Sequence, residues 1–110
     1  MLKSYVLEGT ISAGAAWTRL GTLMTPARTT RRLLEVRPFI SATSGVRIRL
    51  SVGTDVIYEL TAEEVNNLKF PYPADAEIPE GFELVLEAMN PTASAATVIV
   101  EVIVDETVRK

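Results

Sequence analysis

Residues 97–105 read Thr-Val-Ile-Val-Glu-Val-Ile-Val-Asp, and this stretch decides the fold class. Its even-numbered positions are all valine, whereas its odd-numbered positions mix isoleucine with polar and acidic residues. A period of two is typical of a β-strand that buries one face. Residues 82–89 show the same alternation, with Phe82, Leu84, Leu86 and Ala88 on one side. The two runs therefore predict two antiparallel strands joined by residues 91–95, and matching their apolar faces places Ala88 opposite Val98 and Leu84 opposite Val102.

Three further alternating runs lie upstream, at residues 34–42, 46–52 and 56–60. The turn sequences between them, at 43–45 and 53–55, favour three-residue loops, because an odd-length loop keeps core residues opposite core residues. These loops would pair Ile40 with Ile48, Phe39 with Arg49, Leu50 with Tyr58 and Arg49 with Glu59. A two-residue turn at Gly53 and Thr54 is rejected, since it would flip the next strand and bury Asp55 and Glu59.

Two more strands are expected near residues 3–11 and 17–24, and Pro38 predicts an edge or a bulge within its strand. One short helix is predicted over residues 61–68. Thr61 and Glu64 have the spacing of a capping box, in which each side chain accepts a hydrogen bond from the other residue's amide. Residues 71–81 are expected to form a proline-rich, acidic connection.

The 110 residues therefore predict a single domain over 1–110. Its fold class is all-β: an antiparallel, jelly-roll-like β-sandwich of about seven to eight short strands with one short helix. No apolar run is long enough to cross a membrane, because Glu101 interrupts the longest one. Glu8 likewise interrupts the apolar core that a signal peptide requires, so we expect synthesis in a cytoplasm.

Charge is divided unevenly between the two halves of the chain. Residues 1–50 carry eight cations and two acids, whereas residues 51–110 carry three cations and twelve acids. We expect strands from the two halves to pair and to neutralise these charges within one molecule. Arg28, Arg31, Arg32, Arg37, Arg47 and Arg49 could instead bind phosphate groups, but few aromatic residues accompany them, so a nucleic acid partner is disfavoured.

The composition excludes several kinds of chemistry. With no Cys and no His, thiolate catalysis, imidazole catalysis and zinc ligation are ruled out. The remaining carboxylates form no recognisable acid–base pair, and we expect no enzyme activity, no catalytic residue, no cofactor and no metal. The alternative is a ligand-binding module for carbohydrate or calcium, which would use Trp17 and the 71–81 connection with Asp75, Glu77 and Glu80.

The second face of the predicted strands is unusually apolar for a sandwich, whose outer positions are normally polar. A loop of this chain over residues 61–81 could cover it, but another subunit is favoured, because the same face carries Arg and Glu suited to selecting a partner. The predicted interface consists of apolar anchors and charged residues: Leu33, Phe39, Ile57, Val85, Ile99, Ile103, Arg37, Arg47, Arg49, Glu59 and Glu101.

The ending formed by Phe82–Asn90, Pro91–Ala96 and Thr97–Thr107 is a long apolar hairpin with a loop of small residues. In this ending and in its length the chain resembles small β-sandwich or jelly-roll structural proteins of virions, including phage head decoration and cement proteins. The resemblance implies a virion protein, made in the host cytoplasm, whose partners are copies of itself and other virion proteins. It carries no functional residue and implies no membrane partner.

Overall fold

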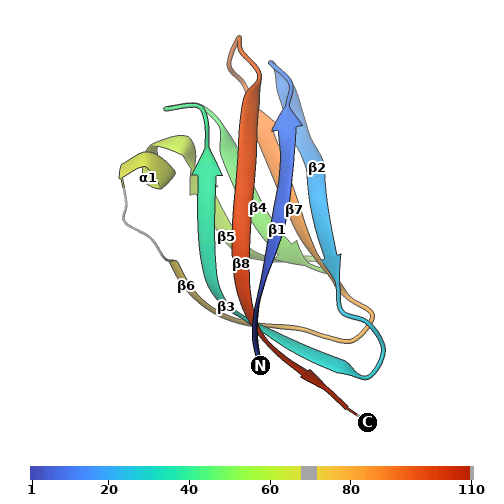
Figure 1. The fold of residues 1–110 in the computed structure, drawn as a ribbon. Helices are drawn as coiled ribbons and strands as arrows, with labels where there is room; N and C mark the ends of the chain where they lie inside the picture. Colours follow the sequence, from blue (N-terminus) through green and yellow to red (C-terminus); the bar gives the residue numbers. More distant parts are fainter. Residues whose placement is uncertain (68–71, 110) are drawn as a thin grey trace.

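The computed structural model describes residues 1–67 and 72–109, which form two four-stranded antiparallel sheets and one short helix (Figure 1). The elements are β1 (Leu2–Ile11), β2 (Ala15–Met24), β3 (Thr29–Ile40), β4 (Arg47–Val52), β5 (Asp55–Thr61), α1 (Ala62–Asn67), β6 (Tyr72–Ile78), β7 (Glu83–Asn90) and β8 (Ala96–Val108). The sheet with strand order β1-β8-β3-β6 is called the β8 sheet below, and the sheet with order β2-β7-β4-β5 is called the β7 sheet. The predicted all-β sandwich is confirmed.

The core lies between the two sheets and is built by the alternation that the sequence displays. The even-numbered valines of β8 are fully buried, as are Leu84, Leu86 and Ala88 on β7. Ile40 and Ile48 also point inward, from opposite sheets. Burying one face of each strand against the other sheet supplies the main stabilising free energy of such a fold.

Two predicted hairpins are wrong, because the chain changes sheet at each of these turns. β3 pairs with β8 and β6, so Ile40 lies opposite Val98 rather than Ile48. β7 pairs with β2 and β4, so Ala88 lies opposite Ile48 rather than Val98. Both arrangements bury the same side chains, and the alternation therefore fixes the buried face of each strand without fixing its neighbours.

β4 and β5 form a hairpin whose predicted register is largely confirmed. Leu50 pairs with Tyr58 and Arg49 with Glu59. The predicted three-residue loop is wrong: Val52 pairs with Asp55, which leaves the two-residue turn that the sequence argument rejected. A bulge in β5 between Val56 and Tyr58 adds one residue to this strand. The inward and outward positions after the bulge are therefore the ones that a three-residue loop would give, and Asp55 and Glu59 both remain exposed.

A second bulge, in β3, brings Leu33 into the core. In β3, Leu33 pairs with Val104 and Glu35 with Ile103, so Leu34 has no partner on β8. The inward phase of the strand shifts at this point, and Leu33 is 0% exposed in the core instead of pointing outward as predicted. Pro38 lies further along β3, two residues beyond Val36, which is the last described residue to pair with β6.

The helix begins with the predicted capping box. The Thr61 amide donates to the Glu64 carboxylate over 3.1 Å, and the Glu64 amide donates to the Thr61 hydroxyl over 3.2 Å. α1 is described to Asn67, and the predicted last residue, Leu68, lies outside the described residues. No helix in the described part of the chain has the length and apolar character needed to span a membrane.

Residues 72–78 were expected to belong to an irregular connection but form the edge strand β6. Its even-numbered residues face inward, ending at the fully buried Ile78, while Pro73, Asp75 and Glu77 are exposed. Proline is compatible with a strand at the edge of a sheet, because one row of amides there has no partner strand.

Ion pairs between the two halves of the chain confirm the predicted neutralisation. Arg31 binds Glu106, Arg32 binds Asp75, Arg37 binds Glu101 and Arg49 binds Glu87. Each pair joins a cation of a strand made early to an acid of a strand made late. The charge asymmetry of the sequence therefore reflects the pairing of strands from the first half of the chain with strands from the second half.

The position of Leu33 gives a direct test of the bulge in β3. Leu33→Ala should lower the free energy of unfolding by about 2–5 kcal/mol, because it leaves a cavity in the core. Phe39→Ala, on the same strand but 53% exposed, should lower it by less than about 1 kcal/mol. Urea unfolding followed by circular dichroism measures both; equal losses would show that Leu33 is not a core residue.

Candidate interaction surfaces

The predicted interface does not form one surface, because its strands belong to different sheets. Phe39, Ile99, Ile103, Arg37 and Glu101 lie on β3 and β8, in the β8 sheet. Arg47, Arg49, Glu59 and Val85 lie on β4, β5 and β7, in the β7 sheet. The expectation that Arg37 shares a face with Arg47 and Arg49 is therefore wrong. The molecule instead presents two outer faces, one on each side of the sandwich.

The outer face of the β8 sheet mixes exposed apolar residues with an excess of acids. Phe39 and Ile99 are cross-strand neighbours, Arg37 lies opposite Glu101, and Val6 follows on β1 beside Glu101. Phe39 and Val6 are each 53% exposed. The charged side chains of this face are Glu8, Glu35, Asp75, Glu77, Glu101, Asp105, Arg32 and Arg37, and the Met1 ammonium group, which binds Asp105, adds a third cation. Acids therefore outnumber cations, and the face has a net negative charge.

The outer face of the β7 sheet is balanced in charge. The Arg49 guanidinium lies 3.1 Å from the Glu87 carboxylate, and Arg47 lies 2.7 Å from Glu59. Trp17 on β2 extends across β7 to stack on Arg49, whose guanidinium carbon is 4.0 Å from the ring centroid. Such a cation–π contact is attractive and restricts the positions of both side chains.

Three predicted anchors are not free for a partner. Leu33 is in the core, as described above. Ile57 is partly buried and packs against the core, because it occupies the bulge of β5. Val85 does point outward, but neighbouring side chains leave it only 9% exposed. Of the apolar anchors, Phe39, Ile99 and Ile103 remain together on one outer face.

The residues of the alternative ligand site do not converge. Asp75 binds Arg32 from the edge of the β8 sheet, whereas Glu80 binds Arg109 and the amide of Arg28. Trp17 lies on the outer face of the other sheet. Within residues 1–67 and 72–109, no group of three or more acids is placed to hold a metal ion.

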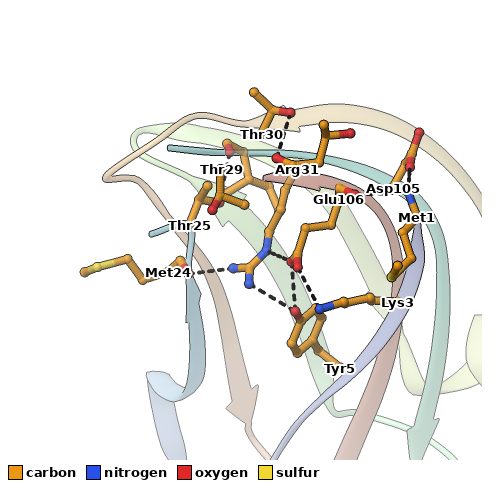
Figure 2. Close-up of polar contacts among 12 residues, drawn as sticks. Met1, Lys3, Tyr5, Met24, Thr25, Thr29, Thr30, Arg31, Asp105 and Glu106 are labelled. Carbon is orange, nitrogen blue, oxygen red and sulfur yellow. Dashed lines mark hydrogen bonds and ion pairs between the residues drawn. The ribbon is translucent and has the colours of Figure 1, made fainter. Parts of the chain in front are cut away.

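A buried polar cluster, which is not among the predicted sites, lies at the end of the sandwich where β1, β3 and β8 meet (Figure 2). Glu106 is 7% exposed and Arg31 is 6% exposed, and Arg31 Nε donates to Glu106 Oε1 over 2.5 Å. The Tyr5 hydroxyl donates to the same oxygen over 2.8 Å, and Lys3 Nζ lies 3.1 Å from the other oxygen. Arg31 also donates to the Met24 carbonyl at the end of β2, which links the two sheets.

These contacts determine the ionisation of Glu106. Burial alone would raise the pKa of its carboxyl, but the hydrogen bonds from Arg31, Tyr5 and Lys3 outweigh burial and lower the pKa from 4.5 to about 2. The hydrogen bond between Lys3 and Glu106 also raises the pKa of the Lys3 ammonium group. The cluster is thus a charged network that remains intact in moderately acidic solution. The sequence does contain one sign of this cluster, because Glu106 occupies the next even-numbered, inward-facing position of β8 after the buried valines.

Replacing Glu106 tests this network. Because its pKa is lower in the folded state, the carboxylate stabilises the fold fully above about pH 4.5, and this contribution is lost as the pH falls towards about 2. Glu106→Gln should lower the free energy of unfolding by about 3 kcal/mol at pH 7. The difference from the natural sequence should shrink between pH 4.5 and 2. Glu101→Gln, on the exposed side of the same strand, is the control; a similar loss in both variants would contradict a special role for Glu106.

Comparison with known proteins gives a similarity of fold and no family. No protein-family model matches the sequence, and no curated protein matches it. Among solved structures, a chain from the acid-stable capsid of Helicobacter pylori bacteriophage KHP30 is similar in fold, with a TM-score of 0.51 and 15% sequence identity. The match covers 97% of this chain and 98% of that chain. The two chains thus share one β-rich fold over nearly their whole lengths.

Proposed function

We propose that this protein is a non-enzymatic structural protein of a virion, which assembles with copies of itself and with other virion proteins. The observation that carries the proposal is the near-complete match to a chain of a phage capsid structure. The match extends over nearly the whole of both chains, so it concerns the entire sandwich and not one shared hairpin.

The strand order supports the same proposal. Successive strands alternate between the two sheets except at the β4–β5 hairpin, which gives the orders β1-β8-β3-β6 and β2-β7-β4-β5. An eight-stranded double sheet built from two Greek keys is a jelly roll, an architecture that recurs among viral capsid proteins. We assign the chain to this architecture, in which the hairpin predicted between residues 34–42 and 46–52 does not form.

The contrast between the two outer faces supports a decoration or cement role. A protein that holds a capsid lattice together needs at least two contact surfaces, one of which can bind a different protein. The outer face of the β8 sheet suits that contact, because Phe39 and Val6 are exposed and the surrounding excess of acids would attract a basic partner. Phe39 would be the central anchor, with Ile99 packed beside it.

The proposal is tested by asking where the protein accumulates. Virus particles from a culture that encodes this chain would be purified on a density gradient and analysed by quantitative mass spectrometry of peptides. We expect its peptides to co-sediment with the particles at a fixed ratio to the main capsid subunit. Peptides found only in the soluble fraction of infected cells would contradict a role in the virion.

The contact surface is tested by Phe39→Glu. The variant should fold with unchanged thermal stability, because Phe39 is half exposed, but it should no longer join particles, because a charge replaces the anchor. Phe82→Glu is the matched control, since Phe82 is 49% exposed but precedes β7 and lies outside the β8 sheet. Equal incorporation of both variants would show that the outer face of the β8 sheet is not the contact.

A further inference from the structure

We infer that two copies of this chain associate through the outer face of the β7 sheet, around a two-fold axis that runs parallel to the strands between β7 and β4. The inference deepens the proposed assembly by naming the surface and the symmetry of the self-contact. The inference rests on the order of charges across the four strands of this face, and that order depends on which strands are neighbours.

One row of side chains crosses all four strands of the β7 sheet. Arg19 on β2 is in register with Glu87 on β7, Glu87 with Arg49 on β4, and Arg49 with Glu59 on β5. The signs along the row are therefore plus, minus, plus, minus. The neighbouring charges Arg47 and Glu83 complete a face on which cations and acids are equal in number.

This row is complementary to itself under only one of the two simple arrangements. When two copies meet face to face around an axis parallel to the strands, β2 faces β5 and β7 faces β4 of the second copy. Arg19 then lies opposite Glu59 of the second copy, and Glu87 lies opposite Arg49 of the second copy. An axis perpendicular to the strands would place each of the four charges opposite its own equivalent, which is unfavourable.

The rows on either side are compatible with the same arrangement. On one side, Val85 would lie opposite Ser51 of the second copy, but both are nearly buried and add little contact, whereas the exposed Val56 would face Thr22. On the other side, Met89 would face Arg47 of the second copy. No acid faces an acid and no cation faces a cation in these rows.

Trp17 and Arg49 lie at the centre of this face, and Trp and Arg are the residue types most enriched at energetic centres of interfaces. Their stacking restricts both side chains before association, which reduces the entropy lost on binding. Four strands of about 4.8 Å spacing and a strand length of about 27 Å for β7 give a face of about 500 Å² in projection. A contact of this size predicts a weak dimer that forms at high local concentration.

The outer face of the β8 sheet is a poorer surface for self-association. Six acids and three cations, the Met1 ammonium group included, would be brought against the same unbalanced set, so two copies would repel each other there. The charge balance therefore separates the two faces: the neutral one suits a second copy, and the acidic one suits a different protein.

The experiment uses Arg19 and Glu59, which lie on the opposite edge strands β2 and β5 and are too far apart to interact within one chain. Arg19→Glu alone and Glu59→Arg alone each place like charges across the interface, so each variant should self-associate at least about tenfold more weakly than the natural chain. An equimolar mixture of the two variants restores both opposite-charge contacts and should form a one-to-one dimer. Analytical ultracentrifugation over a concentration series up to about 1 mM, with native mass spectrometry of the mixture, measures these species.

Each other outcome would overturn the inference. A natural chain that stays monomeric throughout the series, variants that dimerise as well as the natural chain, or a mixture that does not form the mixed dimer all exclude this interface. Restored association when Arg19→Glu is mixed with the natural chain would indicate the perpendicular axis. Phe39→Glu is the control and should dimerise normally; loss of its dimer would place self-association on the β8 sheet. If the chain does not dimerise in this way, the proposed virion function is still tested separately, by the mass spectrometry of purified particles.

Discussion

The structure depends on the burial of one face of β8 against the β7 sheet. β8 is the longest strand, it pairs with β1 on one side and with β3 on the other, and its inward valines are fully buried. Because a strand alternates its side chains, burying the even-numbered residues commits the odd-numbered ones to the outside. The partly exposed Ile99 and Ile103 and the acid between them, Glu101, are thus a geometric result of building the core from a near-continuous apolar sequence.

The same constraint explains how far the sequence could be interpreted. The buried face of β4, β7 and β8 and the cap of α1 were predictable, because they follow from local periodicity and from a three-residue spacing. Strand neighbours were not predictable, because a loop of about five residues can either close a hairpin or cross the roughly 10 Å between sheets, and both choices bury the same residues. The division of the predicted interface into two opposite faces follows entirely from that ambiguity.

Bulges account for the remaining errors. A single unpaired residue in β3 brings Leu33 into the core and Arg31 into the buried cluster, and another in β5 permits the two-residue turn after Val52. Such insertions depend on tertiary packing and leave little local signal, although the adjacent pair Leu33-Leu34 interrupts the alternation. Glu106 is different: its inward phase was apparent, but an acid at a core position looks unfavourable until the strand order brings Arg31, Lys3 and Tyr5 beside it.

The strand order also has a consequence for how the chain reaches its native state. Among the described strands, only β4 and β5 are both consecutive and paired, and the other pairings join segments that are distant in sequence. Proteins dominated by such long-range pairings fold in milliseconds to seconds, which is much slower than helical bundles of similar size. Since β8 occupies the middle of its sheet, β1 and β3 have no common neighbour until β8 has been synthesised. The β8 sheet therefore cannot be completed until β8 has emerged from the ribosome.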